Sequence, residues 1–185
     1  GLSWDSLSST ATNTPHSFDN DFDFIWNIVT DPSNDSMDVI YAATYGSIYR
    51  SADGGASWSK SINGGNAYHN NVAITSNGVV YATLSSDGSS SGRGIWRSDD
   101  GINWTKINDA MFPPIYARIA IGINPLNENE IYFLAAETDG YGQHTDVFFG
   151  GETWTSLWKY EYVSGNGTGS GGIWTDLSSN IPANN

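Results

Sequence analysis

Carboxylates and phenylalanines alternate in the stretch FDNDFDF, where Asp19, Asp21 and Asp23 stand two residues apart. Carboxylate oxygens are the ligands that a hard cation such as calcium prefers, so the spacing makes calcium a candidate. An EF-hand loop would place Gly at its sixth position and Glu at its twelfth, but Phe24 and Thr30 stand there. The alternation is equally typical of a strand with one solvated face. Both interpretations stay open at this point.

Nucleophilic chemistry has little support in the residue types present. The chain has no cysteine, which excludes thiolate nucleophiles, disulfides and cysteine-based metal sites. Its three histidines are scattered and no nucleophile-elbow motif accompanies them, so a Ser–His–Asp triad is not indicated. A second acidic stretch, TDGYGQHTD at 138–146, carries two aspartates and is a weaker calcium candidate. We expect no cofactor, and calcium is the one candidate that the acidic stretches leave open.

Composition and charge narrow the class of protein. The 185 residues suffice for one domain with a sizeable core, or for a piece of a larger one. The net charge is −13 with only seven basic residues, so no basic stripe could neutralise nucleic-acid phosphates or an anionic membrane surface. No apolar run approaches the roughly 20 residues of a membrane span. Abundant aromatic residues together with Gly, Ser, Asn and Thr favour an ordered, turn-rich all-β chain.

An internal repeat would position the candidate residues. Three stretches begin with an aliphatic–aromatic–basic triplet and end with a Trp followed by Ile or Leu: SIYRSADGGASWSKSI (47–62), GIWRSDDGINWTKI (94–107) and SLWKYEYVSGNGTGSGGIWTDL (156–177). Upstream, two further apolar stretches separated by a turn signal precede each of them. One unit therefore predicts four short strands in roughly 50 residues, which is the period of a propeller blade.

The turn between the third and fourth predicted strands resembles the Asp-box, or BNR, repeat, whose pattern is Ser/Thr-x-Asp-x-Gly-x-Thr/Ser-Trp. The full match consists of Ser51, Asp53, Gly55, Ser57 and Trp58. The second copy lacks one residue of the pattern and the third is degenerate; they retain Ser98, Asp100, Gly101 and Trp104, and Trp174. The chain is thus similar to Asp-box propellers, a group with sialidases, xyloglucanase-type glycosidases, sortilin-like receptors and photosystem assembly factors, without matching one of these families in particular.

The resemblance implies an all-β propeller segment that occupies residues 1–185. Its blade repeats would cover 8–62, 63–107 and 108–177, and residues 1–7 would be the tail of a preceding blade. Propellers close with about four to eight blades, and three blades leave open edges. The chain also starts with Gly1 rather than Met. We therefore expect part of a longer protein, with mutual completion by several copies as the alternative.

The box residues have a structural interpretation. A short carboxylate such as Asp53 can accept backbone N–H groups within its own turn. Gly55 can adopt backbone angles that other residues resist, and Trp58 can cover the turn with a large apolar ring. We expect the box residues to build the fold rather than to bind a ligand.

Candidate ligand-binding residues lie in loops that would share the face opposite the boxes. The blade-to-blade loops span 8–23, 63–71 and 108–117, and the loops between second and third strands span 45–47, 85–94 and 137–153. These loops differ most in length between repeats, which favours their face as the binding surface. The candidates are His16, Asp19, Asp21, Asp23, Tyr68, His69, Asp87, Arg93, Tyr116, Asp139, Tyr141, His144 and Asp146.

These observations favour a secreted or cell-surface binding or scaffold module for polysaccharide or an extracellular protein partner. A xyloglucanase-like glycoside hydrolase is an alternative, in which this segment would supply at best one of the two carboxylates that the reaction needs. Sialidase activity is disfavoured because the Arg-Ile-Pro motif is absent. A structural subunit that assembles through its open blade edges is a third alternative. Asn34, Asn103 and Asn166 lie in glycosylation sequons.

Overall fold

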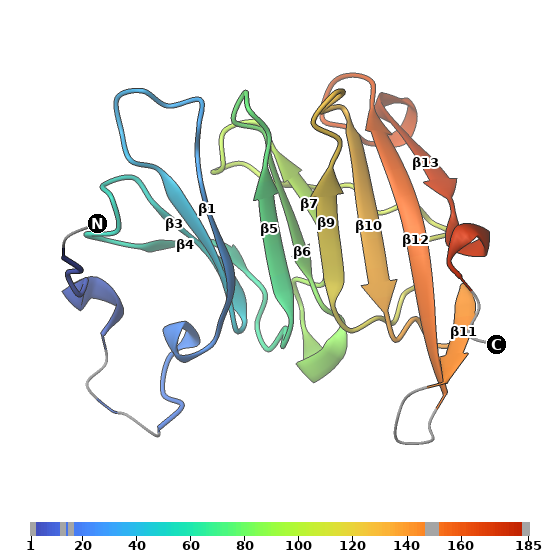
Figure 1. Cartoon of the computed structure of the whole chain (residues 1–185), viewed down its shortest axis with the longest axis horizontal. Helices are drawn as coiled ribbons and strands as arrows, with labels where there is room; N and C mark the ends of the chain where they lie inside the picture. The colour runs from blue at the N-terminus through green and yellow to red at the C-terminus, as the bar shows by residue number, and fades with distance from the viewer. Residues whose placement is uncertain (1–2, 12–13, 15–16, 147–151, 183–185) are drawn as a thin grey trace.

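The computed structural model describes residues 3–11, 14, 17–146 and 152–182. Within them the chain folds as thirteen strands and five short 3₁₀-helices, with no α-helix. The strands form three antiparallel sheets that stand side by side (Figure 1). The first strands of the three sheets, β1, β5 and β9, are neighbours across the assembly. None of the described helices has the length and apolar character needed to cross a membrane.

The first two sheets each contain four strands in sequence order, as the repeat predicted. Blade 1 consists of β1 (Ile25–Thr30), β2 (Ile40–Thr44), β3 (Ser47–Ser51) and β4 (Ser59–Asn63). Blade 2 consists of β5 (Asn70–Ile74), β6 (Val80–Leu84), β7 (Gly94–Ser98) and β8 (Thr105–Lys106). Both fall within their predicted repeats apart from one residue at the end of β4.

The third sheet differs from the prediction because it contains a fifth strand. Blade 3 consists of β9 (Ile119–Ile123), β10 (Glu130–Ala136), β11 (Gln143–Asp146), β12 (Glu152–Tyr162) and β13 (Gly172–Asp176). β11 pairs with the first residues of the long β12, and β13 pairs with its last residues. The segment 137–153 was expected as a loop, and this expectation is wrong for Gln143–Asp146 and for Glu152 and Thr153, which belong to β11 and β12.

The stretch FDNDFDF does not form a strand, so its interpretation as a strand with one solvated face is wrong. Asp21–Asp23 is the short helix η2. Asn20 caps it by accepting the backbone N–H of Phe22, and the Asp23 carboxylate accepts the backbone N–H of Asn20 in return. This reciprocal capping satisfies donors that would otherwise lack a partner. The other short helices are η1 (Ser8–Thr10), η3 (Asp87–Ser89), η4 (Gly169–Gly171) and η5 (Ser178–Asn180). Residues 3–7 form no strand, and their assignment to a preceding blade stays a prediction.

Both faces of blade 2 are covered by neighbouring sheets. On its central strand β6, Val80, Ala82 and Leu84 belong to the core shared with blade 1. Tyr81 points to the other side and belongs to the core shared with blade 3. Fully burying such a large side chain stabilises a fold by roughly 1.5–3 kcal/mol. The stacking of the sheets is therefore the main source of the core.

Blades 1 and 3 each cover blade 2 with one face only. In blade 3, Ile131, Phe133 and Ala135 pack in the core shared with blade 2. The alternate residues Tyr132 and Leu134 lie on the opposite face, where Leu134 is 44 % exposed. This alternation follows from the two-residue period of a strand.

Polar side chains also connect the blades, and several of them bond to main-chain groups. The Asn27 amide on β1 donates to the Val72 carbonyl at 2.7 Å and accepts the Val72 N–H at 3.1 Å. The Thr83 hydroxyl donates to the Ile119 carbonyl across the second interface. The Trp174 indole N–H likewise donates to the Ile107 carbonyl at 3.0 Å. Each bond contributes about 1 kcal/mol and fixes the position of one blade against the next.

Two acidic turns, Ser51–Trp58 and Ser98–Trp104, connect the third and fourth strands of blades 1 and 2. In the first, the Asp53 carboxylate accepts the Ser57 hydroxyl at 2.6 Å and the Ser57 N–H at 2.9 Å. The Ser51 hydroxyl also donates to it at 2.7 Å. These donors, above all the Ser57 hydroxyl, hold the pKa of Asp53 at about 2. The carboxylate thus has the turn-building role expected from its spacing.

The second turn repeats this arrangement one residue shorter. The Asp100 carboxylate accepts the backbone N–H groups of Asn103 at 2.7 Å and Ile102 at 2.8 Å. These bonds, with the Asn103 backbone first, hold the pKa of Asp100 well below its usual range. The Trp104 indole at the end of the turn donates to the Ser61 hydroxyl of blade 1 at 2.8 Å. The turn therefore also fixes blade 2 against blade 1.

We predict that the fold loses stability in acid as these turn carboxylates are protonated. Because the pKa of Asp53 is lowered from 3.8 to about 2 on folding, its contribution is complete above about pH 4 and is lost as the pH falls through about 2. Asp53→Asn should therefore be less stable than wild type at pH 7 and lose less stability across this window. Urea midpoints from Trp fluorescence at pH 7, 4, 3 and 2 measure both effects.

Asp35→Asn, at an exposed carboxylate between β1 and β2, is the matched control. It should leave the wild-type acid profile unchanged. An Asp53→Asn variant with wild-type stability at pH 7 would contradict the turn-building role.

We also predict that any side chain at Gly101 destabilises the fold, because the second turn lies very close to blade 1. Gly101 has φ +68°, and a Cβ there would overlap the Tyr41 hydroxyl. Gly101→Ala should destabilise the chain by about 2–4 kcal/mol, the sum of a left-handed backbone and overpacking. Gly140 has φ +81° but open space around it. Gly140→Ala should cost only about 1 kcal/mol, and equal urea midpoints for the two variants would refute the steric argument.

Candidate functional site

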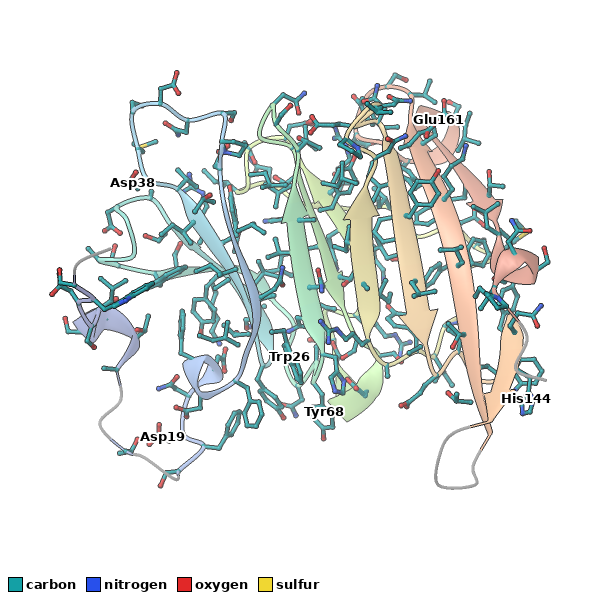
Figure 2. The ribbon with its side chains drawn as sticks, in the orientation of Figure 1. Asp19, Trp26, Asp38, Tyr68, His144 and Glu161 are labelled. Carbon is teal, nitrogen blue, oxygen red and sulfur yellow. The ribbon has the colours of Figure 1, made fainter. Side chains whose placement is uncertain are left out.

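The candidate site lies at the end of the sheets opposite the acidic turns. Figure 2 shows Trp26 and Tyr68 at this end, and Asp38 at the other. The turn Ser51–Trp58 belongs to the Asp38 end, because the Gly54 N–H donates to the Asp38 carbonyl. The structure thus separates the loop face from the turn-bearing face as the strand order predicted.

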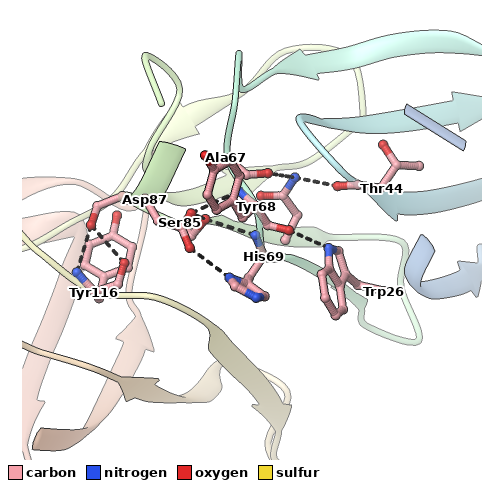
Figure 3. A network of polar contacts seen from close by, with 10 residues as sticks. Trp26, Thr44, Ala67, Tyr68, His69, Ser85, Asp87 and Tyr116 are labelled. Atoms are coloured by element: carbon pink, nitrogen blue, oxygen red, sulfur yellow. Dashed lines mark hydrogen bonds and ion pairs between the residues drawn. The ribbon is translucent and has the colours of Figure 1, made fainter. Parts of the chain in front are cut away.

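A polar network joins the loop before β5 to the loop after β6 (Figure 3). The Asp87 carboxylate lies 2.8 Å from Nδ1 of His69. Its other oxygen accepts the Tyr68 N–H at 2.9 Å and the Ser85 hydroxyl. The Ser85 hydroxyl in turn accepts the His69 N–H at 3.0 Å. Asp87 therefore orients the imidazole and leaves Nε2 as the ring nitrogen available to a ligand.

Exposed aromatic rings surround this network, and we call Phe18, Phe24, Trp26, Tyr45 and Tyr68 the aromatic patch. Tyr45 stacks on Tyr68 with centroids 5.5 Å apart and an interplanar angle of 21°. Phe18 contacts Tyr45 edge-on at 4.7 Å and lies 5.7 Å from Phe24. The exposed fractions of Phe18, Phe24 and Tyr68 are 52 %, 55 % and 43 %. Contiguous exposed rings of this kind mark interaction surfaces more often than isolated apolar residues do.

Trp26 connects the patch to the network. Its indole N–H donates to the Tyr68 carbonyl at 2.7 Å, and its ring lies 4.9 Å from that of His69. The Arg118 guanidinium, from the start of blade 3, lies 5.8 Å from the Trp26 ring centroid. Residues of all three blades therefore meet around the Trp26 ring.

Hydrogen bonds behind the surface hold the loops in place. The Asn70 amide donates to the Thr44 carbonyl at 2.6 Å, which ties β5 to the strand before Tyr45. The Ser86 hydroxyl accepts the Tyr116 N–H at 2.8 Å, which ties the loop after β6 to blade 3. Desolvation, followed by the proximity of Tyr68, raises the pKa of Tyr45. Its phenol therefore stays protonated at neutral pH and can donate a hydrogen bond.

The structure brings three of the predicted ligand-face residues together: Tyr68, His69 and Asp87. The acidic stretch lies beside blade 1. Asp19 accepts the Thr14 hydroxyl at 2.6 Å. Asp21 accepts the Tyr49 hydroxyl and the Lys60 ammonium, each at 2.9 Å.

Asp23 accepts the backbone N–H groups of Asp19 and Asn20, and the Asn20 bond is the main reason for its lowered pKa. Among the described residues, no three His, Cys, Asp or Glu side chains converge as metal ligands.

Two other predicted ligand-face residues, Tyr116 and Tyr141, pack against the protein core. Tyr116 is buried against Phe112, and burial raises its pKa. Tyr141 stacks on Trp158 at 5.6 Å and donates its hydroxyl proton to Asp176. Both side chains therefore pack in or beside the core shared by blades 2 and 3, rather than facing outward as predicted.

The remaining predicted residues do not join the patch in the described structure. Arg93 is exposed on the loop before β7. Asp139 is exposed and has a left-handed backbone with φ +44°. His144 on β11 lies 5.4 Å from the Trp154 ring, in blade 3. His16 and the side chain of Asp146 lie outside the described residues.

Sequence reasoning missed most of the aromatic patch. Phe18 and Phe24 belong to the stretch that was interpreted through its aspartates, and Trp26 was assigned to an apolar strand. Tyr45 stands in a two-residue turn between β2 and β3. A Tyr in so short a turn is the one local signal that could have indicated an exposed ring.

The three sequons differ in how their amides are bonded. The Oδ1 atoms of Asn34 and Asn166 accept the hydroxyls of Ser36 and Thr168, which leaves the amide nitrogens outside these bonds. The Asn103 amide nitrogen instead donates to Asp100 in the second acidic turn at 2.7 Å. A glycan on Asn103 would attach to an atom that the turn uses.

Comparisons with known proteins support the architecture. No protein-family profile and no curated protein matches the chain. Among solved structures, the crystal structure of the GH74 xyloglucanase from Xanthomonas campestris is similar, with a TM-score of 0.54 and 16 % identity. The match covers 92 % of this chain and only 24 % of that protein. At this identity the similarity concerns the fold alone. With three stacked antiparallel blades and a β-propeller neighbour, the chain is a β-propeller segment.

Proposed function

We propose that the chain is a carbohydrate-binding module of the Asp-box propeller group, from a secreted or cell-surface protein, and that the aromatic patch receives the sugar. The observation that carries this proposal is the patch itself. It combines exposed rings of Phe18, Phe24 and Tyr68 with the oriented imidazole of His69. Phe18, Phe24, Tyr45 and Tyr68 belong to neither shared core, whereas Trp26 also packs against the core of blades 1 and 2.

The chemistry of the patch suits a saccharide. A pyranose ring presents C–H groups on its faces and hydroxyls around its edge. Rings such as Tyr68 offer a flat apolar surface at low entropic cost, because they have few rotatable bonds. His69 Nε2 and the Tyr45 hydroxyl lie beside that surface and can exchange hydrogen bonds with sugar hydroxyls.

Charge and fold similarity are consistent with this proposal. The net charge of −13 disfavours phosphate-rich partners such as nucleic acids. The structural neighbour acts on xyloglucan, as its description says. A neutral plant polysaccharide is therefore the first ligand to test.

A glycoside hydrolase is the second candidate, favoured by the xyloglucanase neighbour and by the Asp87 carboxylate beside the patch. Two carboxylates must flank the scissile bond in such enzymes. Asp87 is already bonded to His69 and two further donors, so it is better suited to positioning than to proton transfer. Release of reducing ends from xyloglucan, abolished by Asp87→Asn, would favour this candidate over a binding module.

We predict that Tyr68→Ala weakens binding to xyloglucan oligosaccharides by about tenfold or more, since truncating an aromatic anchor of a binding surface costs more than about 1 kcal/mol. Tyr68→Phe should retain most of the affinity because it keeps the ring. Isothermal titration calorimetry with xyloglucan, cello-oligosaccharide and mannan fragments measures both.

Trp4→Ala is the control, because Trp4 is exposed but lies outside the patch. It should bind as wild type does. If the wild-type chain binds no saccharide of the panel, or if Tyr68→Ala binds unchanged, the proposed function is wrong.

A further inference from the structure

The chain contains four Asp–Gly pairs, a dipeptide that can modify itself without an enzyme. The main-chain nitrogen of the glycine can attack the Cγ atom of the preceding aspartate, because glycine has no side chain to obstruct the approach. A cyclic imide forms and later opens to isoaspartate, in which the main chain runs through the former side chain. The pairs are Asp53–Gly54, Asp87–Gly88, Asp100–Gly101 and Asp139–Gly140.

Hydrogen bonds hold both reacting groups of the two pairs that lie in the acidic turns. The glycine N–H donates to the Asp38 carbonyl at 3.0 Å in the first turn and to the Ser98 hydroxyl at 2.8 Å in the second. The donors described above hold the pKa values of Asp53 and Asp100 below their usual range. Both therefore carry a proton more rarely than an ordinary aspartate. The imide forms from the protonated carboxyl, whose hydroxyl can leave as water, so the turns protect these pairs.

The third pair is held by the polar network at the candidate site. The Asp87 carboxylate lies 2.8 Å from Nδ1 of His69 and accepts the Tyr68 N–H at 2.9 Å. A Cβ on Gly88 would overlap the Asn66 carbonyl, so the glycine is closely packed. The carboxyl would have to leave these partners before it could reach the glycine nitrogen.

The fourth pair, Asp139–Gly140, has none of these restraints. It forms the centre of a turn in which the Tyr141 N–H donates to the Thr138 carbonyl at 3.0 Å. Both central residues are exposed, with φ +44° and +81°. In the described part of the chain, neither the Asp139 carboxylate nor the Gly140 N–H has a hydrogen-bond partner. A Cβ on Gly140 would meet no atom within 4 Å.

From this contrast we propose that Asp139 is a self-modification site, at which the folded chain converts to isoaspartate while the other Asp–Gly pairs stay intact. In the first step the Gly140 nitrogen forms a bond to Cγ of Asp139, and the carboxyl hydroxyl leaves as water with the proton of that nitrogen. In the second step a water adds to the main-chain carbonyl carbon of Asp139 and breaks its bond to the nitrogen. The mass is unchanged, and water is the only co-reactant.

Isomerisation adds a methylene group to the main chain inside a tight turn. The turn leads directly to Tyr141, whose ring stacks on Trp158 at 5.6 Å and whose hydroxyl donates to Asp176. A longer chain between Thr138 and Tyr141 must change the geometry of their hydrogen bond. The modification therefore acts on the margin of the core shared by blades 2 and 3. The proposal does not depend on carbohydrate binding.

Ageing of the full 185-residue chain at neutral pH, folded and in urea, tests the proposal. Isoaspartate is measured by methylation with a protein L-isoaspartate methyltransferase and located by peptide mapping. In urea all four pairs should react at similar rates, because each aspartate is followed by glycine. In the folded chain, Asp139 should react about tenfold or more faster than the other three, because each of those must first open at least two polar contacts.

Two variants separate the reaction from the fold. Asp139→Glu keeps the charge but would need a larger ring, so the signal of this peptide should disappear. Ser57→Ala removes the hydroxyl that bonds to Asp53, so isoaspartate at Asp53 should increase in the folded chain. Asn–Gly pairs also yield isoaspartate, but they release ammonia and are recognised by their change in mass.

Two outcomes would overturn the proposal. The first is a folded chain that forms no isoaspartate at Asp139 while the same chain in urea does. The second is an equal rate at all four pairs in the folded chain, which would show that the hydrogen bonds of the turns and of the network give no protection.

Discussion

A β-sheet that is apolar on both faces needs a neighbour on each side, and this constraint organises the molecule. β6 is the clearest case, with Val80 facing one core and Tyr81 the other. Neither face could stay in water without losing the burial that makes the sheet stable. Blade 2 meets this requirement by stacking between its neighbours, with indole and amide hydrogen bonds linking the blades. On blade 1 the N-terminal segment around Phe22 covers the outward face. The outward face of blade 3 has the same requirement, and no part of the described chain covers it.

The aromatic patch follows from the same stacking. Its residues come from the N-terminal segment, from β1, from the turn after β2 and from the loop before β5. Only the side-by-side placement of blades 1 and 2 brings Tyr45 onto Tyr68. His69 then receives its orientation from Asp87 within blade 2, and Trp26 joins it from blade 1. A binding surface located at a blade junction thus depends on the packing of cores that lie well behind it.

How far the sequence predicted this molecule depends on how local each signal is. The strands of blades 1 and 2 and the turns around Asp53 and Asp100 were predictable, because short-range spacing of apolar and turn residues determines them. The strand β11 was not, since the corresponding segments of blades 1 and 2 contain no strand. Tyr68, His69 and Asp87 were predicted as loop residues. Their proximity to Phe18 and Trp26 was not predictable, because it depends on how blades 1 and 2 pack together and on where the N-terminal segment lies. Tyr116 was wrongly predicted to face a ligand: it lies in a loop, but its ring is buried in the core.

The bond between the Asn27 amide and Val72 has a consequence for how such a chain can diverge. The side chain on one blade recognises a main-chain N–H and C=O on the next, groups that every residue except proline carries. The amide must therefore be retained, while the partner position can drift freely among side chains that fit the core. Duplication of a blade, or exchange of one blade for a distant relative, would preserve this contact without any compensating change. Architectures linked in this way can lose nearly all sequence identity and still keep their blades aligned.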